Sequence, residues 1–159
     1  MPSRQEDPKP GPYRGRGGRI LRHSASKAPK PKPATYEPPP ADDCTVDVFQ
    51  TYPTGSDNDG QMLVVRIWVY RALIVDFAIN QVIEVDGSWK DVARIDCCGG
   101  TVHRHQFDKD GNDLIGHKLI REIPPDAGGE VVNEAYKEAL AVMHDEYDDN
   151  LRRWRGDDA

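Results

Sequence analysis

Hydrophobic and polar positions alternate with a period of two residues from about residue 44 to residue 120, and a helical period follows. The alternating part is rich in Val, Ile, Trp and Tyr, which strands favour, and clusters of turn-forming residues interrupt it. The segments predicted as strands are 44–51, 62–70, 73–85, 89–98, 101–107 and 114–120. Because the turns between them are short, we expect an antiparallel, five- to six-stranded meander sheet.

The period changes after Pro124 and Pro125, which end the last strand. Beyond them, apolar residues recur three and four positions apart, as on one face of an amphipathic helix. These residues are Val132, Tyr136, Ala139, Leu140, Met143, Tyr147, Leu151 and Trp154. We therefore expect one long C-terminal helix packed on one face of the sheet, which makes the domain a two-layer α+β fold.

The first 41 residues differ from the rest in composition. They hold ten of the thirteen prolines, and nine Lys and Arg residues against three Asp and Glu. Proline favours extended conformations, and this segment has too few apolar residues to form a core. We expect residues 1–41 to be a disordered basic arm and residues 42–159 to be the folded domain. The domain is acidic, with twenty-four Asp and Glu against twelve Lys and Arg.

Several classes of protein are excluded by these patterns. The most apolar stretch, residues 62–79, is interrupted by Arg66, Arg71 and Asp76, so no membrane span is expected. The first forty residues lack the apolar region of a secretory signal, and three cysteines do not form a disulfide framework. We therefore expect a cytoplasmic protein that makes no membrane contact. The sequence does not indicate its oligomeric state.

An Arg and Gly cluster lies inside the arm, beside Tyr13. Arginine pairs with phosphates and stacks on bases, so such a cluster is typical of RNA-binding segments. The candidate nucleic-acid-binding residues are Arg14, Arg16, Arg19 and Arg22. The arm is thus predicted to contact RNA or DNA, or a protein partner, and a solubilising tail is the simpler interpretation.

Reactive side chains concentrate in residues 94–105. If Gly99 and Gly100 form a two-residue turn, the strands on either side of it pair in one fixed register. Opposed residues then project to the same face of the sheet. This register gathers Arg94, Asp96, Cys98, Thr101, His103 and His105 on one face. The opposite face carries Ala93, Ile95, Cys97 and Val102 as core residues.

The first interpretation of this cluster is acid–base chemistry. Asp96 would orient His103 as a general base, because a carboxylate fixes the tautomer of a histidine whose pKa is near neutral. His105 would act as the acid, and Arg94 would stabilise the charge that develops when a 2′-hydroxyl of RNA attacks its phosphate.

Two other interpretations compete with it. His103 and His105 could bind a metal together with Asp96 or Cys98, although Cys97 and Cys98 point to opposite faces and cannot easily chelate together. Alternatively, the cluster is a solvated polar sheet face with ion pairs and no chemistry. From the sequence we expect neither a bound metal nor a cofactor.

The same residues resemble a known family. The pattern is Trp89-x-x-Val92-x-Arg94-x-Asp96, a Gly turn, His103-x-His105, a hairpin at Gly111, and a helix over residues 132–139 with Trp154 near its end. It resembles a small bacterial and archaeal domain family whose members have no assigned function, and it is similar in outline to TumE-type toxins of toxin–antitoxin pairs. The resemblance covers roughly residues 62–155. It implies a small α+β domain in which His103, His105 and the acid Asp96 cleave RNA. Because an acidic surface repels RNA, substrate contact would depend on the basic arm.

Taken together, the sequence predicts a small non-enzymatic interaction protein. Its acidic α+β domain carries a flexible basic arm that contacts nucleic acid or a protein partner. The alternative is a toxin-like ribonuclease with the catalytic residues Arg94, Asp96, His103 and His105.

Overall fold

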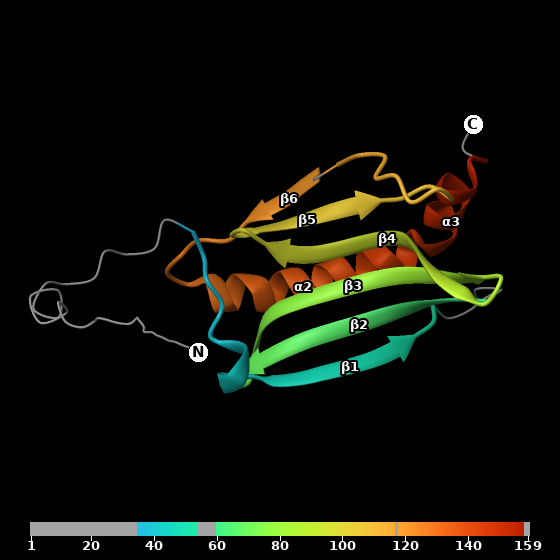
Figure 1. Ribbon diagram of the computed structural model, residues 1–159. Coiled ribbons are helices and arrows are strands. Elements are labelled where there is room, and N and C mark those ends of the chain that lie inside the picture. Colours follow the sequence, from blue (N-terminus) through green and yellow to red (C-terminus); the bar gives the residue numbers. More distant parts are fainter. Residues whose placement is uncertain (1–34, 54–59, 117, 158–159) are drawn as a thin grey trace, which may run out of the picture. The chain divides into compact units, whose positions relative to one another are not determined.

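The computed structural model describes residues 35–53, 60–116 and 118–157 of the chain, which form six strands and two longer helices (Figure 1). The strands make one antiparallel sheet, and their order across it follows the sequence, as in a meander. They are β1 (Thr45–Thr51), β2 (Gln61–Tyr70), β3 (Leu73–Val85), β4 (Ser88–Cys98), β5 (Thr101–Gln106) and β6 (Lys118–Glu122). The predicted α+β class and the meander are therefore confirmed.

The last strand is placed differently from the prediction. It was expected over residues 114–120, and β6 instead covers Lys118–Glu122. The carboxylate of Asp113 explains the shift, because its Oδ1 accepts hydrogen bonds from the backbone N–H groups of Ile115 (3.3 Å) and Gly116 (3.1 Å). Gly116 also has a φ of 63°, which suits glycine and ends the extended backbone. These contacts hold the start of the expected strand in a turn.

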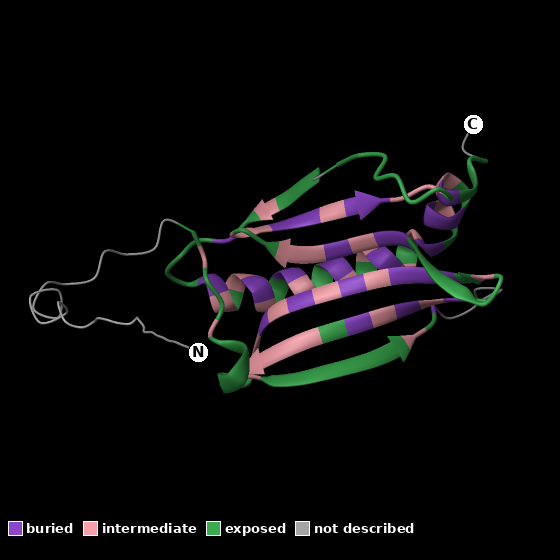
Figure 2. Cartoon of the chain, viewed as in Figure 1, coloured by how far each residue is buried: buried purple, intermediate pink, exposed green. Residues whose placement is uncertain are grey.

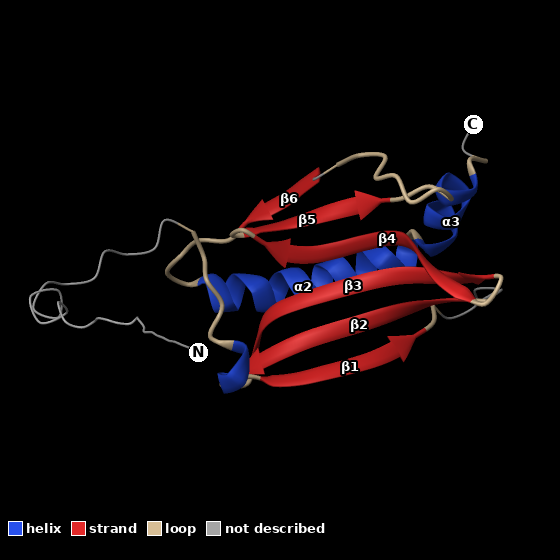
Figure 3. Ribbon diagram, viewed as in Figure 1, coloured by secondary structure: helices blue, strands red, loops and turns tan. Residues whose placement is uncertain are grey.

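The prediction of a single long helix is wrong. Two helices follow the sheet, α2 (Gly128–Asp145) and α3 (Tyr147–Arg155) (Figure 3). They are separated at Glu146, whose φ of −100° and ψ of 12° lie outside the helical range. A contact from the sheet accompanies this break, because the buried side chain of Gln81 donates a hydrogen bond to the Tyr147 carbonyl at 2.8 Å. Such a contact leaves no trace in the hydrophobic period.

The core lies between α2 and one face of the sheet (Figure 2). The sheet contributes Leu63, Val65, Phe77, Ile79, Ala93, Ile95 and Val102, and α2 contributes Val132, Ala135, Ala139 and Met143. The spacing of the α2 residues follows the predicted helical period. Three of the four residues expected to form the core side of β4 and β5 are buried, and the fourth, Cys97, is half-buried against the same core.

A segment that precedes β1 lies against this domain and includes a short 3-10 helix, η1 (Ala41–Asp43). The phenol of Tyr36 donates a hydrogen bond to the Val75 carbonyl at 2.8 Å. Its ring packs so closely on Gly128 that a Cβ atom there would lie 1.9 Å from the ring. Residues 1–34, which make up most of the predicted arm, lie outside the described residues. Over the described ranges, no helix has both the length and the apolar character that crossing a membrane requires.

Candidate functional site

The turn between β4 and β5 has the predicted geometry. Gly99 and Gly100 adopt φ values of 61° and 82°, as a two-residue hairpin turn of this kind requires. The register is the one expected: Arg94 pairs with His105, Asp96 with His103 and Cys98 with Thr101. These six side chains thus come from opposed positions on one face of the sheet, away from α2.

The acid and the first histidine are in direct contact. Asp96 Oδ1 lies 2.8 Å from His103 Nε2, while the second carboxylate oxygen, Oδ2, lies 3.2 Å from Arg94 Nε. On the other side of the His103 ring, Nδ1 is 3.3 Å from Thr101 Oγ1. The Thr101 hydroxyl in turn donates a hydrogen bond to the Cys98 carbonyl at 3.0 Å. The predicted cluster is therefore a connected polar network.

The second histidine has its own carboxylate, which the sequence did not predict. His105 Nδ1 lies 2.6 Å from Asp113 Oδ2. Burial raises the pKa of Asp113, but the hydrogen bond and charge of His105, together with hydrogen bonds from backbone N–H groups, bring this pKa below its ordinary value. The His105 ring also stacks on Phe107, with 5.9 Å between centroids, and meets the His103 ring edge-on at 5.0 Å. Asp113 lies eight residues beyond His105, so only the fold of the intervening turn reveals the pair.

The two imidazoles are buried, and the groups beside them are more accessible. Only 3% of His103 and 5% of His105 is exposed, whereas the exposed side-chain fractions of Arg94 and Asp96 are 29% and 20%. The polar face is thus not the fully solvated surface that one interpretation of the sequence assumed. Solvent reaches the cluster through Asp96 and Arg94.

Two acidic groups outside the cluster, Cys97 and Asp76, interact electrostatically with Asp96. Burial raises the pKa of the Cys97 thiol to about 12, so this thiol stays protonated and is a poor metal ligand. Burial also raises the pKa of Asp76 to about 6, with a smaller contribution from the charge of Asp96. Cys98 is exposed.

Three residues of the cluster could each supply one metal ligand. A ligand atom of Asp96, one of His103 and one of His105 all lie within 4.8 Å of one another.

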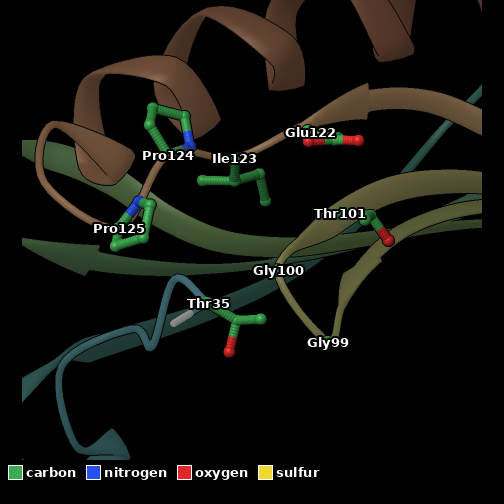
Figure 4. Close-up of a pocket in the computed structure, with 8 residues that line it drawn as sticks. All are labelled: Thr35, Gly99, Gly100, Thr101, Glu122, Ile123, Pro124 and Pro125. Carbon is green, nitrogen blue, oxygen red and sulfur yellow. The ribbon is translucent and has the colours of Figure 1, made fainter. Parts of the chain in front are cut away.

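A separate pocket beside the Gly99–Gly100 turn is shown in Figure 4. Of the residues in the cluster, Thr101 alone lines this pocket, so Asp96, His103 and His105 lie outside it.

A second surface, at the outer edge of β1, was not predicted. Residues 45–50 are all exposed, including Val46 (45%), Val48 (53%) and Phe49 (40%). Among the described residues, no strand pairs with the outer edge of β1, because β1 is the first strand of the sheet. The sequence pattern predicted the strand correctly but gave no indication that both of its faces are uncovered.

No protein-family model, curated protein or solved structure matches this chain. The similarity to TumE-type toxins stays a prediction that rests on the residues of the sequence pattern. The arm residues proposed to bind nucleic acid, Arg14, Arg16, Arg19 and Arg22, lie outside the described residues.

Proposed function

We propose that this chain is a non-enzymatic interaction protein whose acidic domain binds an extended segment of a protein partner along β1. The observation that carries this proposal is the exposure of β1 on both faces beside a backbone edge that no described strand occupies. Edge strands present a row of N–H and C=O groups to which another chain can add a strand.

The side chains of β1 suit such an addition. Val46 and Val48 pair with Trp68 and Arg66 and lie on the face away from α2, whereas Phe49 pairs with the buried Val65 on the opposite face. An added strand would therefore contact apolar side chains above and below its backbone. Contacts between neighbouring strands on each face are the main source of stability in a sheet.

Features that protect an edge strand are scarce in β1. Natural sheets prevent unwanted pairing with lysines, prolines, bulges or very short edge strands. The seven residues of β1 contain one charged residue, Asp47, and neither lysine nor proline. An unprotected edge of this length supports a role in binding.

The basic arm supplies a second contact in this proposal. The acidic domain repels phosphates, so nucleic acid would bind through Arg14, Arg16, Arg19 and Arg22 of the arm. Affinity of the full chain for single-stranded RNA should then fall steeply with salt, and replacing these four arginines by alanine should remove most of that salt dependence.

A photo-crosslinking experiment in the cells that produce the protein tests binding at β1. Benzoylphenylalanine replaces the exposed Val48 in the full chain, and a matched variant carries it at Lys137, an exposed position on α2. A discrete adduct at position 48 alone, lost when Val46→Lys is added, is the expected result. Identical adducts from both positions would overturn the proposal. An adduct with twice the mass of the chain would also contradict it, because it would show self-pairing.

The toxin-like ribonuclease remains a second candidate because Asp96, His103 and Arg94 are in contact. A general base must come within hydrogen-bonding reach of the proton that it removes, and the low exposure of both imidazoles weighs against contact with an RNA backbone. Expression of the wild type should be toxic in this case, and His103→Ala should relieve the toxicity. A harmless wild type would rule this candidate out.

A further inference from the structure

We propose that Asp96, His103 and His105 bind a divalent transition-metal ion such as Zn²⁺, which the sequence led us not to expect. Their ligand atoms already lie within 4.8 Å of one another. Zinc bonds of about 2.0–2.2 Å to nitrogen and oxygen place tetrahedral ligand atoms roughly 3.3 Å apart. Small side-chain rotations would therefore bring the three atoms to the separations that an ion requires.

The proton positions around His103 favour a cation at this site. The Thr101 hydroxyl has one proton, and it donates that proton to the Cys98 carbonyl. Toward His103 Nδ1, 3.3 Å away, it can then only accept, an arrangement that suits the tautomer with a proton on Nδ1. The other ring nitrogen, Nε2, faces Asp96 Oδ1 at 2.8 Å. A neutral imidazole in this tautomer would direct a lone pair at a carboxylate, and a cation between the two stabilises that arrangement.

Asp96 offers one of its two oxygens to an ion. Its Oδ2 contacts Arg94, and its Oδ1 is buried and accepts no well-aligned hydrogen bond despite the short distance to His103. A buried carboxylate oxygen of this kind normally has a partner. The structure therefore holds Oδ1 in place beside the imidazole, where a metal would complete its contacts.

His105 has the outer contact that metal-binding histidines use. Its Nδ1 is 2.6 Å from Asp113 Oδ2. The carboxylate suits the tautomer with a proton on Nδ1, and in this tautomer Nε2 is the ring nitrogen that would bind the metal. Pairs of this kind orient metal-binding histidines and increase their basicity.

The packing of the two imidazoles and the exposure of Asp96 also favour metal binding. Stacking on Phe107 and the edge-on contact between the imidazoles fix both rings, so little side-chain freedom would be lost on binding. Asp96 is partly exposed and gives an ion a route from solvent. Three protein ligands and a solvent-facing position describe an open metal site, which holds a water as its fourth ligand.

Metal titration of the untagged full chain tests this proposal. Calorimetry with Zn²⁺ and visible absorption with Co²⁺ should both show one ion per chain. His103→Gln, His105→Gln and Asp96→Asn should each weaken Zn²⁺ binding by at least about 100-fold, and Asp113→Asn by about 10- to 100-fold. His23→Ala, which removes a histidine of the arm, should bind Zn²⁺ as the wild type does.

Unfolding curves without metal distinguish lost ligands from a lost fold. Added Zn²⁺ should raise the melting temperature of the wild type and of His23→Ala, and should not raise that of Asp96→Asn even if this variant folds normally. Absence of Zn²⁺ binding by the wild type would overturn the proposal. Equal Zn²⁺ affinity of the wild type and the three ligand variants would overturn it as well, since the ion would then lie elsewhere.

Discussion

Replacing Asn150 by alanine should destabilise the domain strongly, because this residue connects α3 to the sheet. Asn150 is fully buried. Its Nδ2 donates a hydrogen bond to Gln81 Oε1 at 3.0 Å. Its Oδ1 accepts hydrogen bonds from Arg104 at 2.5 Å and from Arg153 at 3.1 Å. Alanine removes all three contacts from one position.

The expected loss of unfolding free energy follows from the partners that remain. Gln81 is itself fully buried, and its Oε1 would lose the donor from α3. A buried acceptor left without its partner costs about 1–3 kcal/mol. Arg104 would lose one acceptor but keep its ion pair with Glu146, and a hydrogen bond to a charged group contributes about 1.5–3 kcal/mol. We expect a total loss of about 3–5 kcal/mol, a large share of the 5–15 kcal/mol typical of a domain.

Urea unfolding followed by tryptophan fluorescence and circular dichroism measures this loss. Asn80→Ala is the matched control, because the side chain of Asn80 donates an exposed hydrogen bond to Asp91, and its loss should stay below about 0.5 kcal/mol. The double variant with Gln81→Leu should lose less than the sum of the two single variants, since both partners are then apolar. A loss below about 1 kcal/mol for Asn150→Ala, or strict additivity in the double variant, would refute the reasoning.

Two further predictions concern the other end of the sheet. Because burial raises the pKa of Asp76 to about 6, the folded state binds this proton more tightly than the unfolded state, and stability falls as pH rises from about 4 to 6. Asp76→Asn should therefore raise the melting temperature at pH 7.5 and leave it unchanged near pH 4, and an equal effect at both pH values would contradict this. Gly128→Ala should cost about 1–3 kcal/mol in chemical denaturation, because its Cβ would lie 1.9 Å from the Tyr36 ring. Gly129→Ala, whose Cβ would meet Val75 at an ordinary 3.5 Å, should cost less, and equal losses would count against the Tyr36 contact.

The register of the site could be predicted because local chemistry determines it. Two consecutive glycines with positive φ make a tight turn, and the period of two then determines which residues share a face. This is why Asp96 and His103 were correctly paired from the sequence. The same reasoning separated Ile95 and Val102 as core residues, and both are buried.

The environment of the histidines could not be predicted in the same way. Polar residues at alternate positions indicate a face in contact with water, yet His103 and His105 are almost completely buried. Their surroundings depend on the stacking of Phe107 and on Asp113, which the turn after β5 brings back to the site. Such contacts follow from how the turn folds and not from a periodic pattern.

The predicted ends of the helix and of the last strand were wrong for a related reason. The helical period continues through Glu146 without interruption, so the division into α2 and α3 depends on contacts with the sheet, among them the hydrogen bond from Gln81 to the Tyr147 carbonyl. The position of β6 depends likewise on hydrogen bonds to the Asp113 side chain. In both cases a polar contact between residues outweighs the hydrophobic period.

Hydrogen exchange of the β1 amides tests most directly whether this protein binds a partner by adding a strand. The measurement compares the full chain alone with the complex purified after cross-linking at Val48. If an extended segment of the partner pairs with β1, backbone amides of residues 45–51 that exchange quickly in the free protein should slow by at least about tenfold, and those of β6, at the opposite edge, should not change. Unchanged exchange along β1, with protection elsewhere on the domain, would contradict the proposal.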